Sequence, residues 1–99
     1  NPDDGDVVYN LGVLYLQQAL SRSQPDPELL NKAVSQLQTS LQKSPHLAEP
    51  YFTLGVAYMA LNQNAEARDA FETYLELDSD PGSQAYQEAT RYLEALPEQ

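Results

Sequence analysis

Residues that carry out catalysis or bind metal ions are few in this sequence of 99 residues. It contains no cysteine and a single histidine, His46, which follows Pro45 and has no obvious partner. Neither a Ser-His-Asp nor a Cys-His arrangement can be assembled, and the lack of thiols excludes disulfides and thiolate metal sites. We therefore expect no catalytic residue and no cofactor.

One stretch has the residue types of a calcium-binding loop. Asp78, Asp80 and Gly82 combine carboxylates with a turn residue at close spacing. However, Pro81 interrupts the ligand pattern, and Ala89 stands where such a loop needs a bidentate glutamate. We therefore expect no metal site here, and we interpret the many other carboxylates as solvated side chains on helix surfaces.

The balance of charges narrows the classes of partner. The formal net charge is −10, whereas nucleic acids and anionic membranes are bound through basic patches. This charge favours a neutral or basic partner protein, although it serves equally well to keep a small domain in solution. No run of about 18 apolar residues is present, so we expect no direct membrane insertion. Nothing in the sequence indicates a cellular compartment.

Helical periodicity dominates, and signals for β-strands are nearly absent. Two segments have the i, i+3, i+4, i+7 spacing of a helix with one buried face. Their apolar residues are Leu30, Ala33, Val34, Leu37 and Leu41, and then Ala67, Ala70, Phe71, Tyr74 and Leu75. Two other segments, 11–16 and 52–59, are apolar on almost all sides. Helices of this kind must be covered by neighbouring elements on more than one side. Prolines and turn residues predict five helices, at about 6–21, 27–43, 48–61, 65–77 and 83–96.

The helices repeat along the chain. The stretch VYNLGVLY (8–15) is matched by YFTLGVAY (51–58), so that Gly12 and Gly55 are 43 residues apart. Two other pairs are 34 residues apart, Ala33 with Ala67 and Gly55 with Ala89. We interpret 34 as the underlying repeat, with nine extra residues inserted between the first two helices, around 19–27.

A repeat of 34 residues made of two helices is typical of the tetratricopeptide repeat family, which this sequence resembles. On the first helix of each repeat, the resemblance is carried by Val8, Leu11, Gly12 and Tyr15, and by Tyr51, Leu54, Gly55 and Tyr58. On the second helices it is carried by Ala33, Leu37, Ser40 and Pro45, and by Ala67 and Phe71. The second repeat departs from the pattern where Tyr74 replaces a small residue and where Pro81 comes two places late.

The resemblance implies an all-α fold, a right-handed α-solenoid of two helix–turn–helix hairpins and a C-terminal capping helix. We expect residues 1–99 to form a single domain, with the first repeat at 5–47, the second at 48–81 and the capping helix at 82–97. Pro2 precedes Gly12 by ten residues, as Pro45 precedes Gly55. We therefore expect this segment to belong to a longer chain with a further repeat upstream.

The resemblance also implies a function, because the first helix of each repeat in this family lines a concave groove that holds peptides or partner helices. The chain is then a non-catalytic protein–protein interaction module, a scaffold or assembly adaptor. The expected groove residues are Tyr9, Asn10, Val13, Leu16, Phe52, Thr53, Val56, Met59, Tyr86 and Gln87. The expected acidic rim consists of Asp6, Glu49 and Glu94. Such a surface suits a protein or peptide with apolar anchors and basic flanks.

Two alternatives remain open at this point. The apolar rows could be partly core, because apolar stripes at helical spacing are more often buried than ligand-binding. The segment could also have a structural role, either as a homo-oligomer or as a spacer between other domains of a longer chain.

Overall fold

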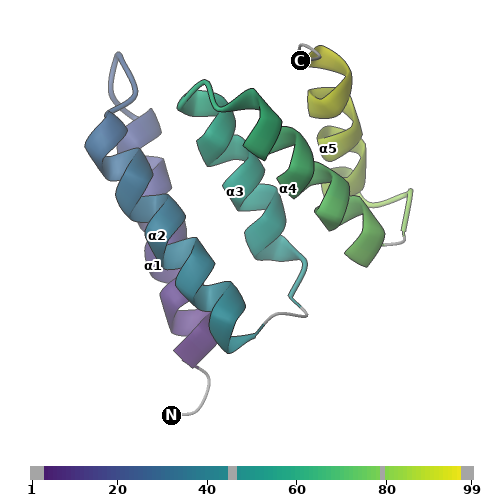
Figure 1. The fold of residues 1–99 in the computed structure, drawn as a ribbon, viewed down its shortest axis with the longest axis horizontal. Helices are drawn as coiled ribbons and strands as arrows, with labels where there is room; N and C mark the ends of the chain where they lie inside the picture. Colours follow the sequence, from purple (N-terminus) through teal and green to yellow (C-terminus); the bar gives the residue numbers. More distant parts are fainter. Residues whose placement is uncertain (1–3, 45–46, 79, 97–99) are drawn as a thin grey trace.

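Five α-helices make up most of the structure (Figure 1), a computed structural model that describes residues 4–44, 47–78 and 80–96. The side chains of residues 4–6 lie outside this description, as do Pro45 and His46. The helices are α1 (Asp4–Leu20), α2 (Pro27–Lys43), α3 (Glu49–Ala60), α4 (Asn64–Leu77) and α5 (Gln84–Ala95). The described residues include no strand, so the prediction of an all-α fold of five helices is confirmed. None of the helices in these ranges is long and apolar enough to cross a membrane.

The helices stack as successive hairpins. α1 packs on α2 and α3 packs on α4, and the stack continues because α2 packs on α3 and α4 packs on α5. Figure 1 shows this order along the longest extent of the molecule, 39 Å, with the first hairpin at one end and α5 at the other. Each hairpin therefore covers an apolar face of the next one, as expected for a helical repeat.

Two glycines allow the helices of each hairpin to cross closely. A Cβ atom on Gly12 would lie 2.9 Å from Cγ of Leu37, and one on Gly55 would lie 2.6 Å from two ring atoms of Phe71. Both distances are well inside van der Waals contact. Gly12 and Gly55 thus occupy the same place in the two hairpins, which accounts for their position in the repeated motif.

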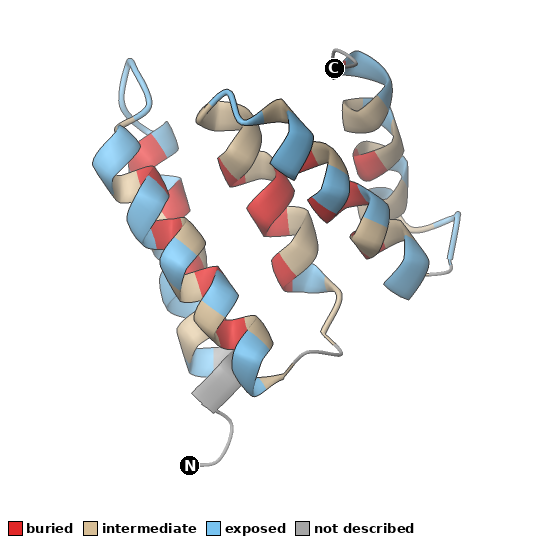
Figure 2. Ribbon diagram, viewed as in Figure 1, coloured by how far each residue is buried: buried red, intermediate tan, exposed pale blue. Residues whose placement is uncertain are grey.

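Buried residues occur on every helix of the stack (Figure 2), and among the described residues they form three clusters. Between the two hairpins, Ala57 of α3 packs with Leu30 and Ala33 of α2. Farther along, Phe71 of α4 packs with Ala89 of α5. The buried residues therefore belong mainly to the contacts between neighbouring helices, and no helix could hide its apolar face alone.

The first hairpin is longer than the second. α1 continues for eight residues past Gly12, whereas α3 continues for five past Gly55. Six residues connect α1 to α2, against three between α3 and α4, and α2 begins six residues before Ala33, against three for α4 and Ala67. The additional residues thus lengthen both helices by nearly a turn as well as the loop. Ala19, in this added part, is fully buried, so the insertion contributes to the core.

Local chemistry sets the helix ends. Asp26 caps α2, since its carboxylate accepts a hydrogen bond from the Glu28 amide at 3.0 Å and proline occupies the first turn. Two residues after the end of α3, Asn62 has a left-handed conformation with φ of 63°, which asparagine tolerates better than most residues. At α5, the hydroxyl of Ser83 accepts from the Tyr86 amide at 3.0 Å. Side-chain caps therefore fix the beginnings of α2 and α5.

Candidate functional site

The structure places most of the predicted groove residues on partly accessible surface of α1, α3 and α5. Two of them, Asn10 and Gln87, are exposed. Those of intermediate exposure are Tyr9, Val13, Phe52, Val56, Met59 and Tyr86. We refer to these eight residues as the groove surface.

Leu16 and Thr53 differ from the expectation, because both are buried. Leu16 is 7% exposed and packs with Ala19 and Leu30, since the longer first hairpin and α3 enclose it. Thr53 is 9% exposed, and its hydroxyl donates a hydrogen bond to the Glu49 carbonyl at 3.2 Å. These two side chains therefore belong to the core and not to the accessible surface.

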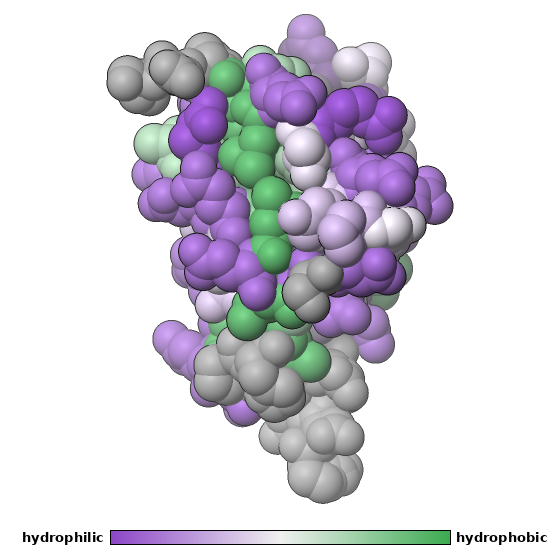
Figure 3. Space-filling model, turned by 90° about the vertical axis from the view of Figure 1, so that its right-hand side faces the viewer, coloured by the Kyte–Doolittle hydropathy of each residue, from purple (hydrophilic) through white to green (hydrophobic). Residues whose placement is uncertain are grey.

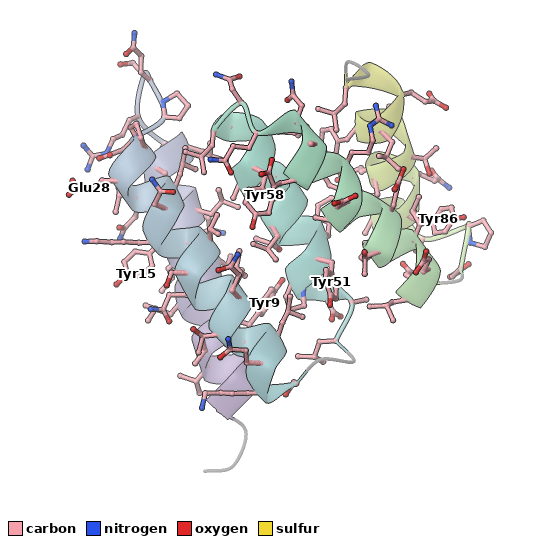
Figure 4. The ribbon with its side chains drawn as sticks, viewed as in Figure 1. Tyr9, Tyr15, Glu28, Tyr51, Tyr58 and Tyr86 are labelled. Atoms are coloured by element: carbon pink, nitrogen blue, oxygen red, sulfur yellow. The ribbon has the colours of Figure 1, made fainter. Side chains whose placement is uncertain are left out.

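Tyr9 joins α1 to α3. Its ring packs against the buried cluster that contains Leu37 and Leu54, and its hydroxyl shares a hydrogen bond of 3.4 Å with Thr53 Oγ1. Figure 4 shows the ring in the space between the two hairpins. Tyr9 is therefore held in place by neighbours from both hairpins while part of its surface stays accessible.

A cavity of about 370 Å³ opens next to Tyr9, between α1 and the beginning of α3. Its lining residues are Tyr9, Asn10, Leu47, Glu49 and Pro50. The fold thus brings together two predicted groove residues and one predicted rim residue that are some 40 positions apart in sequence. The cavity combines an aromatic face, an amide and a carboxylate, which suits a polar or basic group attached to an apolar segment.

Phe52 is part of an aromatic network as well as of the surface. Its ring centroid lies 5.7 Å from that of Phe71, 5.5 Å from Tyr74 and 6.1 Å from Tyr92. The contacts with Phe71 and Tyr74 are edge-to-face, the geometry that aromatic quadrupoles favour. Rings from α4 and α5 therefore hold Phe52 in a fixed orientation.

The remaining predicted residues lie toward the ends of the helices. Gln87 donates a hydrogen bond to the Pro81 carbonyl at 3.4 Å. Glu49 and Glu94 are exposed, and neither forms an ion pair among the residues that the structure describes. The third predicted rim residue, Asp6, has a side chain outside the described residues. The two described rim carboxylates are thus exposed to solvent and are not neutralised by a cation among the described residues.

A second cavity, of about 250 Å³, lies between α3 and α4. Its lining residues are Tyr51, Leu54, Tyr58, Glu66, Asp69, Ala70 and Thr73. Sequence reasoning missed it because Tyr51 and Tyr58 were interpreted only as repeat-motif residues. A signal was available, since Glu66, Asp69 and Thr73 follow helical spacing on one face of α4. Tyrosine rings beside carboxylates suit a basic side chain.

The acidic loop before α5 has an internal structural role. Asp78 accepts hydrogen bonds from the Tyr74 hydroxyl, the Asp80 amide and the Ser83 hydroxyl. The Tyr74 bond is the main cause that lowers the pKa of Asp78, followed by the bond from the Asp80 amide. Burial first, and then the bond to Asp78, raise the pKa of Tyr74 to about 12. Both groups therefore keep their usual charge at neutral pH, and their hydrogen bonds join α4 to α5.

Comparison with protein families gives one finding. Residues 28–87, from the first turn of α2 to the first turn of α5, match a family model described as tetratricopeptide repeat. This match covers more than half of the chain. No curated protein sequence matches the chain.

Proposed function

Because the chain belongs to the tetratricopeptide repeat family, whose members are in general non-catalytic protein-interaction modules, we propose that it binds a partner protein across the groove surface. The partner is a helix or extended segment with apolar anchors and basic flanks. In this role the chain acts as a scaffold or assembly adaptor.

The observation that carries the proposal is the cavity at Tyr9 and Asn10. At this cavity, the partly accessible ring of Tyr9 and the amide of Asn10 lie next to the carboxylate of Glu49. Tyr9 and Asn10 belong to the first hairpin and Glu49 to the second, and the two hairpins pack on each other. Aromatic residues on a rigid frame are the usual anchors of a protein interface. Phe52 of α3 and Tyr86 of α5, which are partly exposed, provide further aromatic surface of the same kind.

Charge supports the choice of a basic partner. The net charge of −10 produces a negative field, which speeds the association of a basic segment and weakens with added salt. Glu49 precedes Phe52 by three residues and Glu94 follows Gln87 by seven, two turns along the same helix, and both glutamates are exposed. In this arrangement the apolar anchors of the partner supply most of the binding affinity. The acidic rim raises the association rate and favours basic partners over others.

Peptide display against the immobilised chain tests the proposal. We expect the selected peptides to be enriched in apolar residues flanked by Lys or Arg. An Asn10→Arg variant should then lose affinity for a selected peptide by about tenfold or more. The matched control is Gln42→Arg, which makes the same change of charge at an exposed position of α2, outside the groove surface. Circular dichroism should show an unchanged fold for both variants.

Two results would count against the groove surface. Equal loss of affinity in Asn10→Arg and Gln42→Arg would indicate a general charge effect, and no loss in either would place the binding site elsewhere. Phe52→Ala is a less clean test, because it also removes ring contacts with Phe71 and Tyr92. Light scattering addresses the alternative of self-association, since a dimer that buries Tyr9 and Phe52 would leave no groove surface for a partner.

A further inference from the structure

The cavity of about 250 Å³ between α3 and α4 is separate from the groove surface. We call it the α3–α4 pocket. None of its lining residues belongs to the groove surface, although both use α3. On this helix the pocket residues are Tyr51, Leu54 and Tyr58, and the geometry of an α-helix turns them about a third of a turn away from the groove residues. The pocket is therefore available to a different occupant.

Two tyrosine rings stand over an apolar floor in this pocket. Tyr51 and Tyr58 are two turns apart on α3, about 10 Å along its axis, and Figure 4 shows both between α2 and α4. Both are partly exposed, whereas Leu54 and Ala70 are buried, at 4% and 7% exposed. The Tyr58 hydroxyl accepts a hydrogen bond from Gln38 Nε2 of α2 at 3.0 Å. The packing of three helices therefore holds these side chains in place.

The side of the pocket that α4 forms is acidic. Glu66 and Asp69 are exposed and one turn apart, and neither forms an ion pair among the residues that the structure describes. The nearest cation on the same helix, Arg68, donates a hydrogen bond to the Leu96 carbonyl at 3.1 Å, at the end of α5. α2, which holds the Tyr58 ring, has no charged residue within 33–42. The described part of the chain thus supplies no cation for these two carboxylates.

The packing of the repeats does not require these carboxylates. The residues 34 positions earlier, Lys32 and Ser35 of α2, include no acidic side chain. Glu66 lies in the first turn of α4, where a negative charge is stabilised by the helix dipole, but Asp69 lies a turn farther along, where that gain is small. The combination of carboxylates and tyrosine rings is therefore particular to the second hairpin, which favours a binding role.

We propose that the α3–α4 pocket binds the side chain of an arginine in an extended segment of a partner protein, as a second site beside the groove surface. Charge complementarity indicates a cation, because two carboxylates without an ion pair line an open cavity. Arginine fits better than lysine, since its planar guanidinium stacks on an aromatic ring and donates to two carboxylates at once. The volume suits one side chain, because pockets for whole small molecules usually measure about 300–1,000 Å³.

The surface around the pocket supports a polypeptide as the occupant. Glu72 and Glu76 continue the acidic side of α4 beyond the pocket, and every exposed charged residue of α4 is acidic. A segment whose arginine enters the pocket would pass along this surface, which attracts further basic residues. The same charge repels nucleic acids and anionic lipids.

NMR titration of the isotope-labelled 99-residue chain tests the inference residue by residue. The probe is the peptide Gly-Ser-Arg-Ser-Gly with blocked ends, and two further peptides carry Lys or the uncharged isostere citrulline in place of Arg. We expect saturable shifts at the amides of Tyr51, Tyr58 and Asp69, with a Kd in the millimolar range because one side chain buries little surface. The citrulline peptide should bind about tenfold more weakly or worse, and the lysine peptide about threefold more weakly.

Two double variants with the same change of charge separate the pocket from a general effect. Glu66→Gln with Asp69→Asn removes the pocket carboxylates and should raise the Kd of the arginine peptide by about tenfold or more. Glu72→Gln with Glu76→Gln changes exposed positions of α4 outside the pocket, and it should raise the Kd by less than about threefold. All four side chains are exposed, so the amide spectra of both variants should show an intact fold.

Two further measurements address other occupants of the pocket and of the surface. Free arginine carries a carboxylate as well as the guanidinium, so the negative field should make it bind about threefold more weakly than the peptide or worse. The far end of the stack shows an apolar band between hydrophilic flanks (Figure 3), through which copies of the chain could associate. Spectra of the free chain at two concentrations identify the signals that such association shifts, and we expect the pocket signals not to be among them.

The inference is overturned by the absence of a saturable shift at millimolar peptide, by shifts confined to the groove surface, by equal weakening in the two double variants, or by undiminished binding of the citrulline peptide. Equal binding of the lysine peptide would refute the choice of arginine, and equal binding of free arginine would refute the choice of a polypeptide. Because the test changes no residue of the groove surface, its failure leaves the test of partner binding in the groove unaffected.

Discussion

A single methyl group at position 55 should destabilise the fold, although alanine is the better helix former. Gly55 lies in the middle of α3, where replacement by alanine would gain about 1 kcal/mol of helix propensity. The new Cβ would lie 2.6 Å from Cε1 and Cζ of Phe71. Phe71 is fully buried and cannot move freely, because its ring stacks on Tyr92 at 5.2 Å and meets Phe52 at 5.7 Å.

The size of the effect follows from two opposing contributions, the gain in helix propensity and the cost of overpacking the core. Overpacking a well-filled core typically costs about 1–3 kcal/mol, and a clash with a wedged aromatic ring lies at or beyond the upper end of that range. After the propensity gain of about 1 kcal/mol is subtracted, Gly55→Ala should lower the free energy of unfolding by about 2 kcal/mol or more. For a domain of this length, the Tm would fall by about 8–16 °C or more.

Gly12→Ala is the internal comparison. Its Cβ would lie 2.9 Å from Cγ and 3.0 Å from Cδ2 of Leu37, and an aliphatic side chain with two rotatable bonds can adjust more easily than a stacked ring. We therefore expect the free energy of unfolding of this variant to stay almost unchanged. Urea denaturation followed by circular dichroism measures the free energy of unfolding of both variants. Equal m values would show that the same unfolding transition is compared in each. A free energy of unfolding for Gly55→Ala at or above that of the unmodified chain, or no lower than that of Gly12→Ala, would refute the reasoning.

Three further predictions concern the caps and the loop before α5. Asp26→Ala removes the cap on the Glu28 amide and should cost about 1 kcal/mol in urea denaturation. Tyr74 has its pKa raised from 10.0 to about 12 in the folded state, so its contribution to stability is complete below pH 10 and is lost as the pH rises to 12. The stability difference from Tyr74→Phe should therefore shrink over that interval. Asp78 has its pKa lowered from 3.8, so its contribution is complete above this value and is lost in acid; the difference from Asp78→Asn should shrink as the pH falls below about 4.

The helices and their order could be predicted because local chemistry determines them. Pro27 and Asp26 mark the beginning of α2 in the sequence, and in the structure they occupy its first turn and its cap. The small residues of the repeated motif were also informative. Gly12 and Gly55 predict close helix crossings, and the distances to Leu37 and Phe71 show such crossings. Because the sequence repeats, the motif residues occur twice. A motif that recurs at the repeat spacing identifies a helix crossing more reliably than a single occurrence does.

Exposure within the candidate site could not be predicted in the same way. Leu16 and Met59 occupy matched positions, but Leu16 is buried while Met59 keeps intermediate exposure. The difference arises because Leu16 is enclosed by Leu30 of its own longer hairpin and by Ala57 of the next one. The cavity beside Glu66 and Asp69 was missed for a related reason, since it exists only where α3 and α4 are brought together.

The same reasoning explains why identical patterns give a core in one repeat and a surface in the next. Leu11 and Leu54 are the same residue type at the same point of the motif, yet they are 38% and 4% exposed. Nothing in the residues distinguishes them; the only difference is that α2 covers α3, while no described helix takes that place at α1. In a stack of repeats, whether an apolar face is core or docking surface is decided by its place in the array. An exposed apolar residue in a repeat should therefore be compared with its covered counterpart in the other repeat before it is assigned to partner binding.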